Sequence, residues 1–218
     1  MNYDSVPLRD FKELNDWETV IFVYQSALKQ VETKIDILNG EFQHRHKYNP
    51  IEHVKSRIKT PESIVKKLKR HGYESSIENM VRYVNAIAGI RISCSFTSDI
   101  YLIADMISKQ NDLTILARRD YMKNPKKSGY RSYHMLVTTP VFLSDSIIDT
   151  KAEIQIRTVA QDFWATLEHK MHYKFEGDGP DYITKELREC ARYVAELDTR
   201  MEELNNEIQK YGKLSDKK

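Results

Sequence analysis

The sequence predicts an α+β fold: a mixed sheet of about five strands packed by helices, with long helices at both ends of the chain. Apolar residues recur three and four apart near both termini, as on one face of a helix. Segments in the middle of the chain alternate apolar with polar residues, as strands do. Two of these strand segments carry a dense set of charged and aromatic side chains, which indicates a binding surface.

Each element follows from a local signal, taken in order along the chain. A loose leader over residues 1–15 is expected to precede a helix from Asp16 to about Asn39, where Gly40 suits a helix stop. Residues 41–59 contain Pro50 and no regular pattern, so we expect them to be irregular. The elements expected after them are helices over residues 60–72, 76–84 and 98–110, strands over 90–96, 113–117, 128–134 and 153–158, and loops near 120–129 and 140–148.

The C-terminal part is expected to be helical. Thr158 can cap one helix, and residues 177–180 (GDGP) should end that region. From Asp181 onward apolar residues follow the heptad spacing of coiled coils, which favours contact with another subunit. The stripe consists of Leu187, Cys190, Val194, Leu197, Met201, Leu204, Ile208 and Tyr211, and residues 212–218 are expected to fray.

The composition describes a globular chain of 218 residues, with 40% hydrophobic and 30% charged residues. A net charge of +2 gives no global signature of nucleic-acid binding. Cys94 and Cys190 are too few for a disulfide framework or a thiolate zinc site, and they fit a reducing compartment. We find no secretory signal pattern and no apolar run near the ~18 residues of a membrane span, so we expect a cytoplasmic protein.

The two polar strand segments supply the candidate site. Because side chains alternate along a strand, Glu153, Gln155 and Arg157 share one face, and Tyr130 and His134 share another. A carboxylate, an amide, a guanidinium, a phenol and an imidazole on one surface suit a charged aromatic ligand such as a nucleotide. Glu153 can bind Mg²⁺ or take a proton from a hydroxyl, and its polar neighbours favour such a role over a plain surface glutamate.

Cationic residues at three places in the sequence can bind a nucleotide, and the residues at each place can also be explained without a ligand. Ser63, Lys67 and Arg70 share one helix face, as a triphosphate requires, but a solvated helix face has the same pattern. Arg91 can stack on a base or can form a structural ion pair. The lysine-rich loop near Lys126 can hold phosphates or can be only a solubilising loop. A Walker-type glycine loop and a dinucleotide fingerprint are both absent from the sequence.

Three sequence blocks in this order resemble the small alarmone synthetases, single-domain relatives of the Rel/Spo synthetase family, and the chain looks nearer to their RelP type than to their RelQ type. The blocks are residues 128–134 (SGYRSYH), 153–158 (EIQIRT) and 163–169 (FWATLEH). The resemblance implies a nucleotidyltransferase-like synthetase domain over residues 48–176, between an N-terminal helical segment (1–47) and a C-terminal helical oligomerisation segment (177–218).

That family transfers pyrophosphate from ATP to the 3′-hydroxyl of GTP or GDP with Mg²⁺, giving AMP and (p)ppGpp. By resemblance, Arg57 and Arg91 would sandwich adenine, and Tyr130 would stack on guanine. Glu153 would activate the 3′-hydroxyl and help to bind Mg²⁺. The remaining roles are Lys59, Ser63, Lys67 and Arg70 at the ATP phosphates, Lys126 and Arg131 at the acceptor nucleotide, His134 contacting phosphate or orienting the metal site, and Gln155 supporting the site.

Position 86 departs from the family pattern. Members usually carry an aspartate that binds magnesium just before the Ile-Ala-Gly sequence, and this chain has Ala86 there. Alanine has no donor atom, and Asn85, if it lies on a strand, would face the other way. Loss of a direct ligand should cost more than the roughly 10–100-fold typical of residues behind the ligands. We therefore expect nucleotide binding with poor turnover.

The resemblance also implies a homotetramer, which agrees with the heptad stripe. His53 replaces the aromatic residue with which RelQ-type members bind their product, so strong product activation is not expected. Two alternatives remain open. One is a non-catalytic nucleotide-binding regulator without a competent metal site. The other is a single-stranded RNA-binding module built on Tyr130 and the lysine loop, with RNA otherwise a secondary partner.

Overall fold

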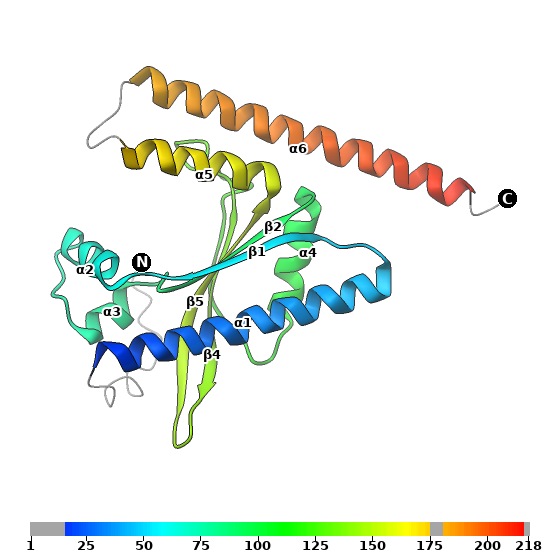
Figure 1. Ribbon diagram of the computed structural model, residues 1–218. Helices are drawn as coiled ribbons and strands as arrows, with labels where there is room; N and C mark the ends of the chain where they lie inside the picture. The colour runs from blue at the N-terminus through cyan, green and yellow to red at the C-terminus, as the bar shows by residue number, and fades with distance from the viewer. Residues whose placement is uncertain (1–15, 175–180, 216–218) are drawn as a thin grey trace.

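The computed structural model describes residues 16–174 and 181–215, which form six helices and one five-stranded sheet (Figure 1). The expected α+β fold with long helices at both ends is confirmed. The strands are β1 (Ile51–Ile58), β2 (Ala88–Cys94), β3 (Thr114–Asp120), β4 (Tyr133–Phe142) and β5 (Ile147–Thr158). The helices are α1 (Trp17–His46), α2 (Pro61–Arg70), α3 (Ile77–Tyr83), α4 (Thr97–Ser108), α5 (Val159–Lys174) and α6 (Asp181–Ser215).

The sheet is mixed and has the order β1-β2-β5-β4-β3. Strands β2 and β5 are parallel, and the other neighbouring pairs are antiparallel. The central strand is β5, where Glu153 lies opposite Gly89 of β2 and Leu136 of β4. A side chain at this position is supported by strands on both sides, which suits a functional group that must stay in place.

The two faces of the sheet differ in chemistry. Ala152, Ile154 and Ile156 are fully buried in the main core, to which α1 and α4 contribute their apolar sides. The intervening residues of β5, from Lys151 to Arg157, point to the opposite face. The alternation predicted for this strand is therefore confirmed, and it places the polar residues away from α1 and α4.

Helix α1 is longer than the sequence indicated. Gly40 does not end it, and the helix continues until Lys47, which has a left-handed φ of 52°. A glycine inside a helix costs about 1 kcal/mol relative to alanine. Beyond Gly40 the helix carries an ion pair between Glu41 and Arg45 (2.9 Å) and a contact between the rings of Phe42 and His46, whose centres lie 4.3 Å apart.

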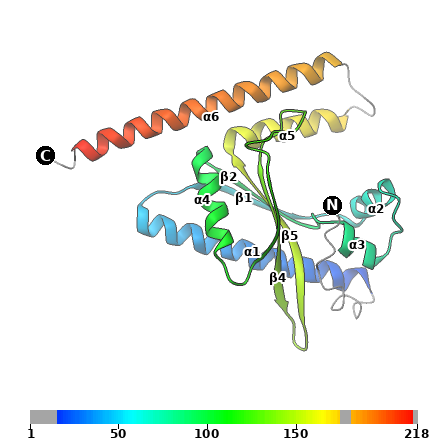
Figure 2. The ribbon, with the colours of Figure 1, turned by 180° about the vertical axis from the view of Figure 1, so that it is seen from behind.

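Two strand predictions were wrong in position. Residues 51–58, expected to be irregular, form edge strand β1, whose mostly exposed side chains show no apolar alternation. Residues 128–132, expected to be a strand, lie in the loop before β4. Strands β4 and β5 instead extend through much of the expected loop near 140–148 and pair as far as Phe142 and Ile147. The end of this hairpin projects beyond α1 (Figure 2).

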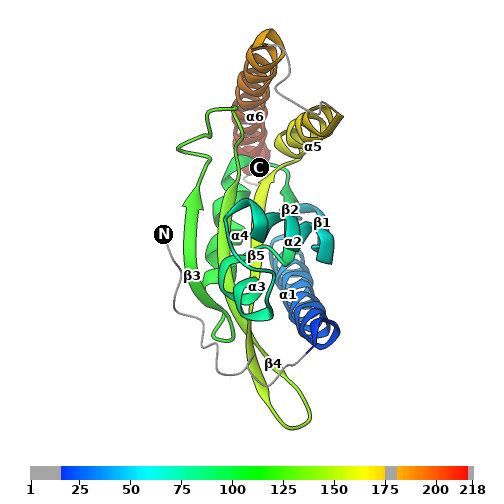
Figure 3. The ribbon, with the colours of Figure 1, turned by 90° about the vertical axis from the view of Figure 1, so that its left-hand side faces the viewer.

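The last two helices lie side by side at one end of the molecule, away from α1 (Figures 1 and 3). Thr158 caps α5 as predicted, because its hydroxyl accepts a hydrogen bond from the N–H of Gln161 (3.1 Å). The predicted leader (1–15) and the break at 177–180 lie outside the described residues. Within the described residues, no helix is long and apolar enough to cross a membrane.

Candidate active site

Glu153 lies in the middle of β5 and is held by its neighbours. Its carboxylate accepts a hydrogen bond from Nε2 of Gln155 (2.9 Å) and lies 3.5 Å from Nδ1 of His134. Burial raises the pKa of this carboxyl, but the contacts with His134 and Gln155 and the charge of Lys67 lower it by more, so the net shift is downward. Glu153 is therefore ionised near neutral pH, as a metal ligand or a proton acceptor must be.

Tyr130 reaches the same group from the loop before β4. Its hydroxyl lies 2.9 Å from Nε2 of His134, so close polar contacts join Tyr130, His134 and Glu153. Tyr121, which no sequence pattern indicated, packs edge-on against the rings of Tyr130 and His134. Nζ of Lys126 lies 4.8 Å from the centre of the Tyr130 ring and 4.9 Å from that of Tyr121. An aromatic platform with an adjacent cation suits a base and its phosphates.

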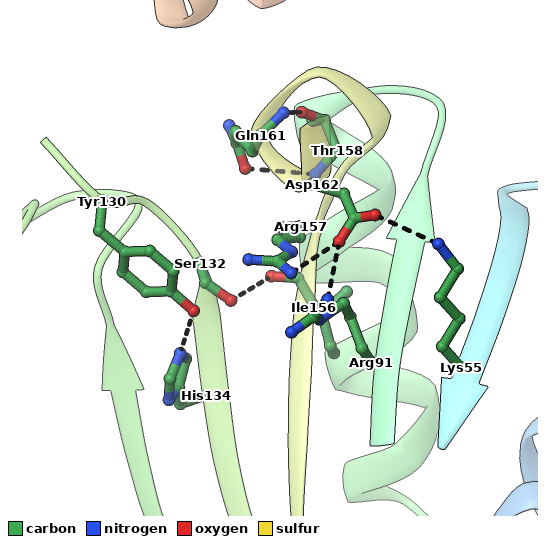
Figure 4. A network of polar contacts seen from close by, with 10 residues as sticks. All are labelled: Lys55, Arg91, Tyr130, Ser132, His134, Ile156, Arg157, Thr158, Gln161 and Asp162. Carbon is green, nitrogen blue, oxygen red and sulfur yellow. Dashed lines mark hydrogen bonds and ion pairs between the residues drawn. The ribbon is translucent and has the colours of Figure 1, made fainter. Parts of the chain in front are cut away.

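Asp162, in the first turn of α5, lies close to three cations and was not predicted as a site residue (Figure 4). Its Oδ1 accepts a hydrogen bond from Nη2 of Arg157 (2.6 Å) and lies 3.4 Å from Nη1 of Arg91. Its Oδ2 lies 3.7 Å from Nζ of Lys55. Arg157 is almost completely buried, and its guanidinium carbon lies 6.0 Å from the centre of the Tyr130 ring. Asp162 therefore keeps two guanidinium groups in place beside the predicted base-binding residues.

The predicted phosphate-binding cations lie on the other side of Glu153. Lys59 follows β1, and burial together with the charges of Arg57 and Lys67 lowers its pKa. Lys67 on α2 has its pKa lowered mainly by burial, although Glu153 acts in the opposite direction. Such crowding of positive charge is relieved when an anion binds. Arg70 belongs to the same group, because its charge also lowers the pKa values of both lysines.

Ser63 lies in the first turn of α2, on the same short helix as Lys67 and Arg70. Its backbone N–H donates to the hydroxyl of Thr60 (3.3 Å), the residue that caps this helix. The predicted start of the helix at Thr60 is confirmed. The positive end of the helix dipole lies at Ser63 and favours phosphate oxygens, whereas Lys67 and Arg70 lie in the last turn of the same helix.

Ala86 lies in the turn between α3 and β2, so the strand geometry assumed for Asn85 was wrong. Nζ of Lys151 donates to Oδ1 of Asn85 (3.0 Å) and to the carbonyl oxygen of Arg82 (3.1 Å). The amide oxygen of Asn85 thus accepts a hydrogen bond from a buried lysine, and this contact, not the alternation of side chains along a strand, fixes its direction. Burial lowers the pKa of Lys151 to about 8. Lys151 anchors the turn that carries position 86.

Two cavities with shared walls connect these groups. The larger, about 430 Å³, lies between the Tyr130 loop, His134 and α5, and the smaller, about 230 Å³, is lined by Ala86 and Glu153. Both volumes together are of the size that holds small-molecule ligands. Three predicted residues, Arg57, Arg91 and Gln155, line both cavities.

Arg131 is the predicted residue whose side chain turns away from this site. Its Nη1 donates to the carbonyl oxygen of Met122 (2.6 Å), and it lines a hollow between the loop and α6. Arg131 therefore braces the loop that carries Tyr130. The sequence could not reveal this, because residues 130 and 131 were assigned to a strand.

The donor set fits a magnesium site only in part. Within the described residues, no group of three or more His, Cys, Asp or Glu side chains has the arrangement of a metal site. Magnesium in nucleotide enzymes needs one or two carboxylates together with phosphate oxygens. Glu153 supplies one carboxylate, and Ala86, in the wall of the same cavity, supplies none. The side chains therefore form an incomplete magnesium site.

Comparison with known proteins identifies the class. Residues 56–178 match the family model described as a region found in RelA / SpoT proteins. The chain is 45% identical over 195 residues to GTP pyrophosphokinase YwaC of Bacillus subtilis (strain 168), covering 89% of this chain and 93% of that protein.

Two solved structures show the same fold. Small alarmone synthetase 2 from Bacillus subtilis has a TM-score of 0.80 at 44% identity, covering 88% of this chain and 99% of its own. Small alarmone synthetase 1 from Bacillus subtilis, bound to its product pppGpp, has a TM-score of 0.82 at 33% identity, covering 88% and 98%.

The chain belongs to the RelA/SpoT family, since the family model covers more than half of it. Within that family it is a small alarmone synthetase, because the relatives that match over nearly their whole length are of that kind. The resemblance found in the sequence is thereby confirmed.

Proposed function

We propose that this chain is a (p)ppGpp synthetase, which transfers pyrophosphate from ATP to the 3′-hydroxyl of GTP or GDP and releases AMP. The observation that carries the proposal is the position of Glu153. It is an ionised carboxylate near the cations after β1 and on α2 and near an aromatic, lysine-bearing loop. Donor and acceptor can therefore meet at one proton acceptor. A relative of known structure binds pppGpp, a product of this kind.

The donor side would use the cations after β1 and on α2. Arg57 and Arg91 line both cavities and would enclose the adenine ring. Lys59, Lys67 and Arg70, with Ser63 at the start of α2, would hold the phosphates. Among the described residues, the buried Nε atoms of Arg91 and Arg157 have no hydrogen-bond partner. Unpaired buried donors in a cavity wall favour a ligand that supplies acceptors.

The acceptor side would use Tyr130 and Lys126, with guanine stacked on the ring and phosphates near the ammonium group. Glu153 would take the proton of the 3′-hydroxyl, and that oxygen would attack the β-phosphorus of ATP. The bond between the β-phosphorus and the bridging oxygen on the AMP side would break, and the surrounding cations would offset the charge that develops. His134 and Gln155 would orient Glu153, and Arg131 would act through the loop.

A divalent cation is typical of this family, and we propose Mg²⁺, held by Glu153 and by phosphate oxygens. When bound, it would neutralise charge between the two nucleotides. Because Ala86 withholds a second carboxylate, we propose that nucleotides bind but that transfer is slow.

Oligomerisation is a further part of the proposal. Five apolar residues of the α6 stripe are exposed in the single chain: Leu197, Met201, Leu204, Ile208 and Tyr211. Exposed apolar rows of this length favour contact with another subunit, and we propose a homotetramer. A cytoplasmic location remains a prediction from the sequence, consistent with two free cysteines, one of them exposed.

The comparisons do not favour the two alternative functions, a non-catalytic regulator or an RNA-binding module. A direct assay separates all three. ATP is incubated with GDP or GTP and Mg²⁺, and AMP and the 3′-pyrophosphorylated product are measured for this chain and for Ala86→Asp. Product from the aspartate variant supports the proposal. Binding of both nucleotides without product from either protein would instead favour the regulator, and salt-sensitive RNA binding without nucleotide binding would favour the RNA module.

A further inference from the structure

Helix α6 touches the loop that carries the proposed guanine-binding residues. This acceptor loop comprises residues 126–131, whereas the region that defines the family ends at residue 178, before α6 begins at Asp181. Figure 3 shows α6 next to α5, at the end of the molecule where the chain leaves β5. The helix therefore has a relation to the site that neither the family region nor the sequence pattern indicates.

One contact is a hydrogen bond between side chain and backbone. Nε of Arg188 donates to the carbonyl oxygen of Lys127 (3.0 Å). Within the loop, the N–H of Lys126 donates to the carbonyl oxygen of Tyr130 (3.1 Å), and the N–H of Gly129 to that of Lys126 (2.8 Å). Arg188 thus adds an external bond to a short turn whose conformation places Tyr130.

A second contact is steric. Gly129 has a left-handed φ of 92°, and a Cβ built on it would lie 2.5 Å from the Cβ of Ala191. The loop backbone therefore lies directly against α6, and the fit requires a small residue on both sides. Ala191 is 6% exposed, in agreement with this close approach.

α6 itself is fixed to the catalytic domain. Ala191 belongs to a small apolar cluster with Trp164 and Ala165 of α5, and Tyr130 packs against this cluster. Nε1 of Trp164 donates to the carbonyl oxygen of Leu187 (2.9 Å). Further along, buried Asp198 accepts hydrogen bonds from Thr158 (2.7 Å) and from Gln161 (2.8 Å), at the junction of β5 and α5. A helix anchored at both points can hold a loop in place.

We propose that α6 is a structural part of the acceptor-nucleotide site, in which Arg188 and Ala191 are positioning residues for the acceptor loop. They hold Tyr130 and Lys126 in the binding arrangement before the guanine nucleotide arrives. The identity of that nucleotide rests on the proposed function. A loop ordered in advance binds more tightly, because the ordering cost is not subtracted from the binding free energy. Figure 1 shows α2, which carries proposed ATP cations, at a distance from α6, so the effect should be confined to the acceptor.

The test measures two affinities on the full chain by titration calorimetry, with GDP for the acceptor and AMPCPP for the donor. Ala191→Leu should raise the Kd for GDP by roughly tenfold or more, because the loop can no longer approach the helix. Arg188→Ala should raise it by about fivefold, the effect of one lost hydrogen bond. The Kd for AMPCPP should stay within about twofold in both variants. A folding defect would instead weaken the binding of both nucleotides, so the AMPCPP titration distinguishes a local effect from misfolding.

Matched controls lie on the same helix. Glu186→Leu places the same side chain at an exposed position of α6 outside the stripe, and Arg192→Ala removes an arginine that pairs with Glu189 and Glu196 but not with the loop. Both should leave the two affinities unchanged. Trypsin cleavage after Lys126 and Lys127, both exposed, should be faster in Ala191→Leu and Arg188→Ala than in these controls.

Four results are decisive. An unchanged Kd for GDP in both loop-facing variants, or equal loss of GDP and AMPCPP binding, would overturn the inference. An unaltered chain that binds AMPCPP but not GDP would overturn it as well. An unaltered chain that binds neither nucleotide would reject the proposed function itself and, with it, the acceptor site that α6 is said to hold.

Discussion

At the scale of single residues, Tyr130 combines two contacts with different consequences. Its ring supplies the platform on which guanine would stack, and its hydroxyl lies near His134. Tyr130→Ala should weaken GDP binding by about 1–3 kcal/mol, the usual value of base stacking on an aromatic ring. Tyr130→Phe should retain most of that affinity. Calorimetric titration with GDP separates the two, and equal loss in both variants would show that the ring is not the platform.

Lys151 gives a pH-dependent prediction. Burial lowers its pKa to about 8 in the folded chain, against 10.5 for an ordinary lysine. Between these values the unfolded chain holds more protons, so this residue makes the free energy of unfolding increase as pH rises from about 8 to 10. The free energy of unfolding of this chain minus that of Lys151→Met should increase by up to about 1.4 kcal/mol per pH unit between pH 8 and 10. Urea denaturation at pH 8, 9 and 10 measures it, and a constant difference would contradict the lowered pKa.

The sequence predicted individual site residues where they share a regular strand. Glu153, Gln155 and Arg157 could be placed on one face because side-chain alternation is a property of the backbone. Asp162 and Tyr121 were missed, because their contacts depend on how α5 packs against the sheet and on the turn that follows β3. An acidic residue five positions after Arg157 was visible in the sequence, but its direction was not.

At the scale of elements, short α2 separates side chains that face the site from those that face solvent. Lys67 is half-buried and acts on Glu153, whereas Lys69 is exposed on the same helix. Lys67→Ala should weaken AMPCPP binding roughly 10–100-fold, as expected for a charged contact worth about 1.5–3 kcal/mol. Lys69→Ala, the matched control, should change it less than twofold. If Lys67→Ala and Lys69→Ala weakened AMPCPP binding equally, the lysines would act only through the overall positive charge of the helix and not through a specific contact.

Elements were predicted well where capping or burial left a signal. Thr60 and Thr158 cap the N-termini of α2 and α5 in the structure, as their sequence contexts predicted. Edge strand β1 was missed because it has a neighbouring strand on one side only and most of its side chains are exposed. Its sequence therefore lacks the alternation of apolar and polar residues that marks a strand. Residues 128–132 were assigned to a strand because their alternating polar side chains imitate one, although Gly129 has a left-handed φ.

At the scale of the whole molecule, α6 lies at one end, away from α1 (Figure 1), and five apolar residues of α6 beyond Val194 are exposed in the described chain. Leu204→Glu combined with Ile208→Glu should produce a smaller species in sedimentation velocity, because buried charges oppose association. Asn206→Glu adds the same side chain off the stripe and should leave the size unchanged. A chain that is already monomeric would contradict the proposed tetramer.

The proposed reaction depends on one arrangement, in which Glu153 accepts the proton of the acceptor hydroxyl between the donor cations and the Tyr130 loop. The most direct measurement is the single-turnover rate of 3′-pyrophosphorylated product from ATP and GDP, with Ala86→Asp compared with Ala86→Asp combined with Glu153→Gln. We expect the first protein to form product and the second to be slower by about 10²–10⁴-fold, the usual contribution of a positioned base. Equal rates in the two proteins would contradict the role of Glu153, and with it the proposed site.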